Sequence, residues 1–266
     1  MSINNLFAVK KPVIGCLHLL ALPGAPLYGG NMKAVYDMAL EEAAILAHHD
    51  VDGFIVENFR DKPFYPGRVP VETVAALTAV AHEIKRQYDC PLGVNVLRND
   101  GEVAIAIAAA IEAAFIRVNV HGGAVVSDQG IIQGEGHLTM RLRASLSSNA
   151  LVFADVGVKH AAPLAGRGLT VETIDTIERG LADAVIVSGE LTGSETSLED
   201  VRTVRAATNA PLLIGSGATP DNVSKVFDLV DGFIVGSYFK KDGKGDNFVE
   251  PARVSAFMAQ VKKLRA

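Results

Sequence analysis

Short apolar runs alternate with helical patterns eight times along this chain of 266 residues, and no other feature restricts the fold as strongly. Each run is almost continuously apolar and is flanked by turn residues, as is typical of strands buried on both faces of a parallel sheet. Eight strands that alternate with helices predict an α/β fold, a single (β/α)8 barrel, or TIM barrel, that spans residues 1–266. The expected strands are residues 13–18, 53–57, 92–97, 115–120, 151–155, 184–188, 211–215 and 232–236.

The intervening segments and a partial repeat also indicate one barrel. Residues 32–49 and 71–88 carry apolar side chains at helical spacing, and a last helix is expected to begin at Pro251. The segment VDGFIV occurs at 51–56 and again at 230–235, as equivalent strands of one barrel would. A doubly wound sheet is the alternative. The barrel is favoured because glycines follow the seventh and eighth strands, where barrels of this type often hold phosphate.

Composition excludes several classes of function. The net charge is −5 and the basic residues form no long run, so the chain is not expected to bind nucleic acid. The two cysteines, Cys16 and Cys90, are interpreted as reduced thiols of an intracellular protein. The sequence has neither the layout of a signal peptide nor an uncharged apolar window of about 18 residues. We therefore expect a cytoplasmic protein without a transmembrane segment.

Two glycine-containing segments predict a phosphate site. The first follows the seventh strand and precedes a helix that we expect to begin at Pro220, with Thr219 as its cap. The second follows the eighth strand. Backbone N–H groups at the start of a helix attract phosphate because they are unpaired and because the helix dipole favours negative charge. The residues expected to contact the phosphate are Gly215, Ser216, Gly217, Gly236 and Ser237.

Several of the connections that follow the strands are long. Residues 19–30, 58–69, 121–138 and 156–169 are rich in Gly, Pro and charge, whereas helix-to-strand joins such as 89–91 are short. Long loops at one end of a rigid barrel are where ligands are enclosed. We therefore expect the functional site at the carboxyl ends of the strands.

Polar residues collect at these same strand ends, although the strand interiors are almost entirely apolar. A ring of this kind either forms a buried structural network or lines a pocket. The neighbouring phosphate signal favours a pocket. The ring consists of His18, Glu57, Asn58, Asn95, Arg98, Asn119, His121, Asp155, Lys159, His160, Ser188 and Glu190.

Within the ring, Glu57 and Asp155 are the predicted acid/base pair, because carboxyl groups at a partly apolar barrel mouth are suited to proton transfer near working pH. Lys159 is expected to stabilise charge, with a Schiff base as the alternative. The predicted catalytic residues are Glu57, Asn95, Asp155, Lys159 and His160. The side chains predicted to bind the ligand are those of His18, Arg98, Asn119, His121 and Ser188.

A metal site is a further hypothesis for the same ring. Imidazole and carboxylate groups from different strand ends can converge on one ion, and the residues that could do so are His18, Glu57, Asp155 and His160. No H-x-x-H or C-x-x-C spacing supports such a site. No cofactor is therefore predicted, and the binding of a divalent metal ion stays an open alternative.

Six segments carry a likeness that runs from the first strand to the final helix: HLLALPG at 18–24, DGFIVENF at 52–59, LGVNVLRND at 92–100, FIRVNVH at 115–121, ADVGVKH at 154–160 and GSGATP at 215–220. Together they resemble the BtpA/SgcQ family of predicted barrel proteins. That resemblance implies a TIM barrel, and the family includes a cyanobacterial photosystem I biogenesis factor and bacterial members associated with sugar uptake and metabolism. The phosphate end is also similar to that of ribulose-phosphate-binding barrels, which include epimerases, lyases and isomerases.

The leading hypothesis is a cytoplasmic enzyme that acts on a small phosphorylated metabolite, a sugar phosphate, by proton transfer next to a carbonyl. The product would be that of an isomerase, an epimerase or a lyase. The competing hypothesis is a non-catalytic ligand-binding or complex-assembly factor. A nucleotide hydrolase ranks third, because the chain lacks a G-x-x-x-x-G-K-[ST] loop. Barrels of this kind often self-associate, so a homo-oligomer also stays open.

Overall fold

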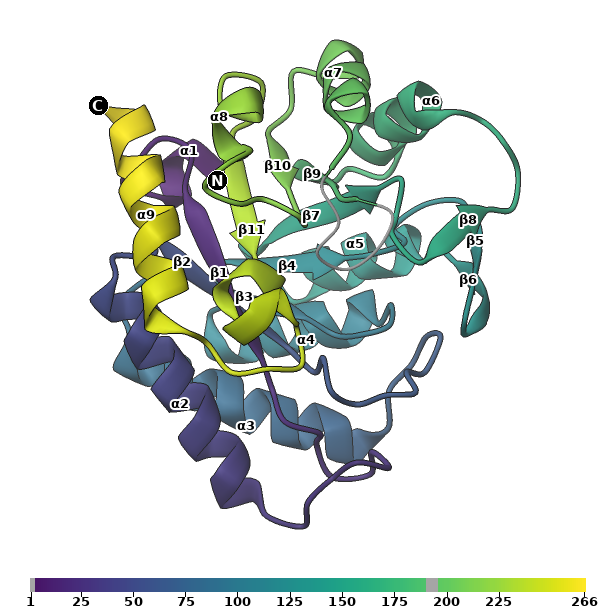
Figure 1. Ribbon diagram of the computed structural model, residues 1–266. Coiled ribbons are helices and arrows are strands. Elements are labelled where there is room, and N and C mark those ends of the chain that lie inside the picture. Colours follow the sequence, from purple (N-terminus) through teal and green to yellow (C-terminus); the bar gives the residue numbers. More distant parts are fainter. Residues whose placement is uncertain (1–2, 190–195) are drawn as a thin grey trace.

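The computed structural model describes residues 3–189 and 196–266, and at its centre lies a closed barrel of parallel strands (Figure 1). Around the ring the order is β1, β11, β10, β9, β7, β4, β3, β2, so the first and last strands pair and close the barrel. All eight predicted strands belong to this ring, which confirms the TIM-barrel prediction. The barrel strands are β1 (Val13–His18), β2 (Gly53–Glu57), β3 (Leu92–Asn95), β4 (Phe115–Val118), β7 (Leu151–Val156), β9 (Ala184–Val187), β10 (Leu212–Ile214) and β11 (Gly232–Val235).

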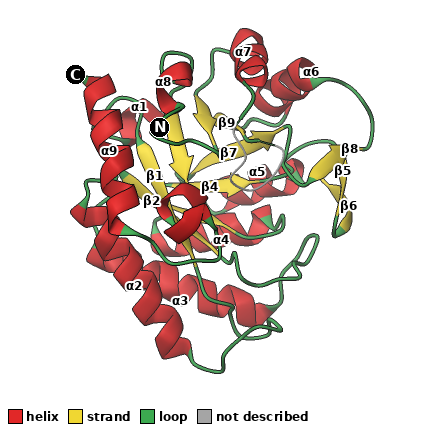
Figure 2. Ribbon diagram, viewed as in Figure 1, coloured by secondary structure: helices red, strands yellow, loops and turns green. Residues whose placement is uncertain are grey.

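Helices surround the strands, as Figure 2 shows by colour. The predicted helices 32–49 and 71–88 each end one residue earlier, as α2 (Met32–His48) and α3 (Val71–Gln87). Within the described ranges, no helix is long and apolar enough to cross a bilayer. The other helices are α1 (Ile3–Leu6), α4 (Gly101–Ile111), α5 (Gly136–Ser145), α6 (Leu169–Ile174), α7 (Leu198–Ala207), α8 (Val223–Val226) and α9 (Pro251–Arg265), the π-helical η1 (Asp175–Arg179), and the 3-10 turns η2 (Ser237–Phe239) and η3 (Lys241–Gly243).

Several barrel strands are shorter than the apolar runs that predicted them. The run 92–97 becomes β3, whose last residue, Asn95, pairs in register with Glu57 on one side and Arg117 on the other. Beyond this point the backbone bonds to side chains instead: the Leu97 N–H donates to Oδ1 of Asn58 at 2.7 Å. Strand pairing therefore stops at the level where polar side chains begin, and this level is the rim of the barrel.

Below the rim, apolar side chains fill the barrel. Phe115 and Phe153 stack with ring centroids 4.7 Å apart, and a Cβ on Gly93 would lie only 2.1 Å from the Phe115 ring, so glycine is needed there. At the other end, Ile3 of α1 and Phe7 pack into the same cluster. Each large apolar side chain buried in this way contributes about 1.5–3 kcal/mol. The interior is thus a packed core.

Two of the predicted loops contain strands. β5 (Ala124–Ser127) and β6 (Gly130–Gln133) form a hairpin, and β8 (Ala161–Pro163) adds to it as a third antiparallel strand. The long connections predicted at 121–138 and 156–169 thus contain strands that the sequence analysis did not predict. Side chains alternate in the hairpin: Val125 and Ile132 are buried, whereas Val126 and Ile131 are exposed. This period of two identifies half-buried strands.

The helix expected to begin at Pro220 begins later and is short. α8 spans Val223–Val226. Thr219 does not cap it; its N–H instead donates to Oδ1 of Asn222 at 2.8 Å, and the Asn222 amide donates to the Gly217 carbonyl at 2.8 Å. The Asn222 side chain thus holds residues 217–222 as a turn. A four-residue helix has a small dipole, so the helix contributes less to anion binding than we expected.

A buried ion pair anchors the segment that follows β11 to the outer helices. Lys240 is fully buried, and its Nζ lies 2.5 Å from Oε2 of Glu42 on α2. The other oxygen, Oε1, accepts from the Val249 N–H at 3.0 Å. One carboxylate therefore holds both ends of the segment 240–249, which passes over the barrel rim.

We predict that Lys240→Ala destabilises the fold by about 3–5 kcal/mol, because Glu42 would remain buried without its partner. Urea unfolding followed by circular dichroism measures the change. The control is Lys62→Ala, which removes the cation of a largely exposed pair with Asp246 and should cost about 1 kcal/mol or less. Equal losses in the two variants would show that the buried pair is not an anchor.

Candidate active site

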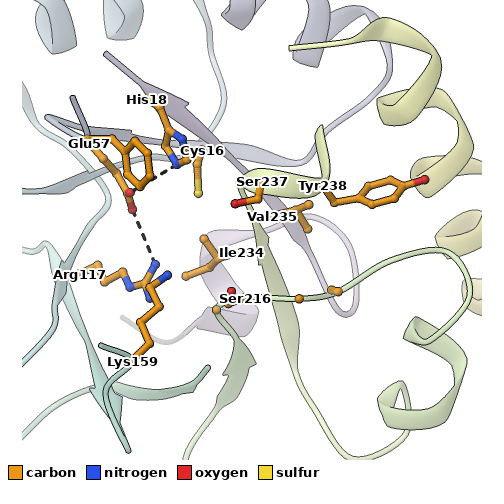
Figure 3. Close-up of a pocket in the computed structure, with 15 residues that line it drawn as sticks. Cys16, His18, Glu57, Arg117, Lys159, Ser216, Ile234, Val235, Ser237 and Tyr238 are labelled. Atoms are coloured by element: carbon orange, nitrogen blue, oxygen red, sulfur yellow. Dashed lines mark ion pairs between the residues drawn. The ribbon is translucent and has the colours of Figure 1, made fainter. Parts of the chain in front are cut away.

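A narrow pocket opens at the carboxyl rim of the barrel (Figure 3). Its free volume is about 30 Å³, which suits one small group such as a water molecule or an ion. Its walls come from both halves of the chain, so the predicted ring and the predicted phosphate segments do meet. The lining residues are Cys16, His18, Glu57, Phe59, Arg117, Lys159, residues 215–218 and residues 234–238.

The strands deliver these polar side chains because of their two-residue period. On β4, Phe115 points into the apolar core, and Arg117, two residues later, lies at the rim. On β7, Phe153 and Asp155 have the same relation. The inward-facing column of each strand therefore changes from apolar to polar at one level, and the charged layer lies directly on the hydrophobic core.

Arg117 is the central cation of this layer and is only 3% exposed. Its Nη2 donates to Oδ1 and Oδ2 of Asp155 at 3.0 and 3.1 Å, and Nη1 lies 3.7 Å from Glu57 Oε1. The Asn119 amide donates to Oδ2 of Asp155 at 2.5 Å. Burial lowers the pKa of Arg117, but Asp155 and Glu57 outweigh it, so the pKa stays above its usual value. Both carboxylate oxygens of Asp155 thus accept hydrogen bonds from Arg117 or Asn119.

Glu57 is held less tightly. Its Oε1 accepts from the Asn95 amide at 3.1 Å. Its Oε2 lies 3.7 Å from His18 Nε2, which is too long for a hydrogen bond. Of the two carboxylates predicted to act as an acid/base pair, Glu57 is the one that lines the pocket, whereas Asp155 lies behind Arg117.

His18 is fixed in orientation by contacts on two sides. Its ring stacks on Phe59 with centroids 4.0 Å apart, and Nδ1 lies 2.8 Å from the carbonyl oxygen of Gly245. Burial lowers the pKa of His18 well below its usual value, and the Lys240 ammonium adds to the effect. A carbonyl can only accept, so Nδ1 carries the proton and Nε2 presents a lone pair towards Glu57.

Lys159 reaches the pocket from the loop that follows β7. Burial of the ammonium and the nearby Arg117 guanidinium lower its pKa to about 8, although Asp155 and Glu57 act in the opposite direction. The loop is held by Arg98, whose Nη2 donates to the Lys159 carbonyl at 2.7 Å. Lys159 can therefore exchange a proton near neutral pH.

Two glycines make room for this layer. A Cβ on Gly215 would lie 2.4 Å from Ile186 and 3.0 Å from Arg117 Nη2, and a Cβ on Gly236 would lie 3.0 Å from His18 Nε2. Gly217 has a φ of +73°, a backbone conformation that favours glycine. The glycines that predicted a phosphate site thus also allow the β10 and β11 ends to approach the charged side chains.

Several predicted site residues lie elsewhere. His160 is exposed on its loop, and His121 is buried outside the pocket, with Nε2 2.8 Å from the Gly180 carbonyl oxygen. Ser188 is buried, and its Oγ has no hydrogen-bond partner among residues 3–189 and 196–266. Arg98 acts on the loop backbone. Glu190 lies outside the described residues.

Sequence reasoning missed Arg117 and Cys16, both of which line the pocket. Arg117 is a charged residue within a strand pattern, two positions from Asn119, and this parity could have placed it in the ring. Cys16 was interpreted only as a buried thiol. It lies two positions before His18 on β1 and so shares the inward face; burial raises the pKa of its thiol.

An eight-stranded parallel barrel with a charged pocket at its carboxyl rim defines a TIM-barrel protein. More particularly, the chain belongs to the BtpA family, whose model matches residues 9–263. It is 46% identical over 259 residues to the photosystem I biogenesis protein BtpA of Synechocystis sp., covering 97% of this chain and 90% of that protein.

Solved structures share the fold at much lower identity. A tryptophan synthase chain of Mycobacterium tuberculosis superposes with a TM-score of 0.63 and 13% identity, over 97% of this chain and 93% of the other. An N-(5'-phosphoribosyl)anthranilate isomerase of Pyrococcus furiosus gives 0.59 and 16%, over 95% and 99%. At these identities the likeness shows the barrel fold alone.

We predict that Lys159 titrates at a pH of about 8. The measurement is a pH titration by NMR after reductive methylation of the lysines with ¹³C-formaldehyde. One dimethyl-lysine resonance should shift through a midpoint of about 8 and be missing from Lys159→Arg, whereas Lys241→Arg, an exposed control, should retain it. A midpoint near 10.5 for the resonance lost in Lys159→Arg would contradict the described burial.

Proposed function

We propose that this protein is an enzyme that moves a proton next to the carbonyl group of a small phosphorylated metabolite, of the sugar-phosphate class. The observation that carries the proposal is the composition of one pocket: Glu57, Arg117 and Lys159 face the glycine-containing backbone at the ends of β10 and β11. Groups that exchange protons and groups that stabilise negative charge thus lie opposite a backbone suited to phosphate.

The phosphate end rests on residues 215–218 and 236–237, which line the pocket. In TIM barrels a phosphate site is frequently formed by the loops after strands seven and eight, and β10 and β11 are the seventh and eighth strands of this ring in chain order. Because α8 is short, the support comes from the local backbone at these glycines rather than from a helix dipole.

The reacting end has three roles to fill, and three residues fit them. Glu57 is the base, because its Oε2 makes no short contact and faces the pocket. Lys159 returns the proton, since its lowered pKa of about 8 allows both forms near neutral pH. Arg117 stabilises the negative charge that develops on the carbonyl oxygen. Asp155 has a positioning role, because it orients the Arg117 guanidinium.

The size of the pocket sets a condition on substrate binding. The free volume of about 30 Å³ holds less than a whole sugar phosphate, so binding requires side chains at the mouth to move apart. Lys159 lies on a loop and is partly exposed, so its four-carbon side chain can shift without disturbing the barrel strands. A bound substrate would then extend from residues 215–218 towards Glu57.

We expect a member of a panel of phosphorylated aldoses and ketoses to lose its C–H proton signal next to the carbonyl when incubated with the protein in D2O. Proton NMR follows the loss and any product. Glu57→Gln should slow the exchange by about 10²–10⁴-fold, as removal of a general base does. The control is Glu41→Gln, an exposed carboxylate on α2. Exchange at the wild-type rate in Glu57→Gln would remove Glu57 from the reaction.

Phosphate binding is tested separately with inorganic phosphate and isothermal titration calorimetry. Gly217→Asp should weaken binding by about tenfold or more, because a carboxylate within about 4 Å repels the anion. Gly30→Asp is a matched control: Gly30 has a φ of +72°, close to the +73° of Gly217, and nothing lies near its Cβ position. Equal phosphate affinities in the two variants would refute the phosphate assignment.

A non-catalytic function is the second candidate, and the name of the Synechocystis relative, a photosystem I biogenesis protein, favours it. A ligand-sensing or assembly factor would keep the barrel and its anion site but convert nothing. A thermal-shift screen with the same sugar phosphates discriminates the two. Ligands that raise the melting temperature but show neither proton exchange nor product would support the binding function and contradict the proposed enzymatic function.

A further inference from the structure

We infer that Cys16, His18 and Glu57 form a binding site for one transition-metal ion of the zinc type. One ligand atom from each side chain lies within 4.8 Å of the other two. All three residues are buried, with exposures of 3%, 3% and 4%. This inference goes beyond the proposed function, in which Glu57 acts as a base without a metal. An ion bound to Oε2 would occupy that base, so the inferred site describes a separate, metal-loaded state of the protein. It shares only His18 and Glu57 with the metal hypothesis made from the sequence.

The barrel register brings the three residues together. Cys16 and His18 are two positions apart on β1, so both point inward. Glu57 is the partner of His18 in the parallel pairing of β1 with β2. The three side chains therefore come from the rigid wall of the barrel rather than from loops, as Figure 3 shows for the upper part of the pocket.

Contacts behind two of the three residues, His18 and Glu57, orient them as metal ligands are usually oriented. The Nδ1 of His18 lies 2.8 Å from the Gly245 carbonyl oxygen, so it donates there and turns Nε2 towards Glu57. The Asn95 amide holds Oε1 of Glu57 at 3.1 Å and leaves Oε2 facing His18. A ligating histidine almost always donates its other ring N–H to such a carbonyl or carboxylate, and ligating carboxylates are likewise hydrogen-bonded.

The contact between His18 and Glu57 is unsatisfied without a cation. The Nε2 lone pair faces the Oε2 of a carboxylate at 3.7 Å, so two acceptors oppose each other. Gly236 leaves the space beside them open, because a Cβ there would lie 3.0 Å from Nε2 and 3.3 Å from the Cys16 Sγ. A metal ion between the three atoms would supply the missing positive charge.

The donor set selects the kind of metal. One sulfur, one imidazole nitrogen and one carboxylate oxygen suit Zn²⁺ and its first-row neighbours rather than Mg²⁺ or Ca²⁺. Tetrahedral zinc places such ligand atoms about 3.3–3.6 Å apart. The His18–Glu57 separation of 3.7 Å lies just above this range, and all three ligand atoms lie within 4.8 Å of one another, so small side-chain rotations would bring them into range. Three protein ligands leave the fourth position open towards the pocket, which is the arrangement of a catalytic rather than a structural zinc site.

Charge and protons balance in this site. Binding replaces the Cys16 S–H bond by an S–metal bond and releases the proton to solvent. The thiolate and the Glu57 carboxylate then neutralise the two charges of the ion. The cations that act on the site are Arg117, Lys159, Lys240 and Arg60. Arg117 is already neutralised by Asp155, and Lys240 by Glu42. The positive layer therefore does not exclude a divalent ion.

Cobalt(II) is the probe for the test, because a Co²⁺ ion bound by a thiolate gives a charge-transfer absorption that nitrogen and oxygen ligands do not. The purified protein is dialysed against a chelator, then against metal-free buffer, and titrated with Co²⁺. We expect one Co²⁺ per chain with the thiolate band, displacement by Zn²⁺, and no displacement by Mg²⁺. His18→Gln should weaken Co²⁺ binding by at least about tenfold.

The chain contains two cysteines, so Cys90→Ser is a decisive control. Cys90 lies on the short connection before β3, and its removal should leave the band intact. That result assigns the thiolate to Cys16 even if Cys16→Ser fails to fold. Absence of the band in the wild type, or its loss in Cys90→Ser, would overturn the inference. Neither readout depends on phosphate binding or turnover, so a negative result here leaves the test of the proposed function unaffected.

Discussion

The guanidinium of Arg117, buried between two carboxylates at the top of the barrel, is the interaction on which the rest of the rim depends. A buried cation of this kind is stable only when it is paired and hydrogen-bonded, and Asp155 supplies both requirements. Because Asp155 takes most of the Arg117 hydrogen bonds, one carboxylate oxygen of Glu57 makes no short contact. The positive charge of Arg117 also contributes to the lowered pKa of Lys159. Arg117 binds Asp155 closely and Glu57 only at a distance, and this difference gives the two carboxylates different roles.

The same arrangement shows how a barrel separates stability from chemistry. Each strand contributes an inward column in which apolar side chains occupy the lower levels and ionisable ones the upper level, as Phe153 and Asp155 do on β7. The aromatic layer provides burial, whereas the layer above it concentrates desolvated charge, which is costly to the fold and is typical of functional sites. Because both layers lie on the same strands, the packed core also fixes the positions of the charged groups.

Much of this architecture could be predicted from the sequence, since buried parallel strands are nearly continuous apolar runs and their ends are marked by polar residues. Glu57, Lys159 and the glycines that follow β10 and β11, all of which line the pocket, were predicted in this way. Arg117 and Cys16 were missed, because their relevance depends on which face of the strand they occupy. The same limit explains why His121 and His160 were included. A position near a strand end does not say whether a side chain turns into the barrel or away from it.

The pairing of β1 with β11 has a consequence for how the protein is made. Cys16 and His18 belong to the first strand, whereas Gly236 and the Gly245 carbonyl lie after the last, so the pocket is built across the seam where the ring closes. During synthesis the amino-terminal strands leave the ribosome long before their partner exists, and no ligand can find a complete pocket until the ring has closed. A molecule that contacts both sides of this seam must therefore favour the closed ring over every partly open form, and so stabilises the whole barrel.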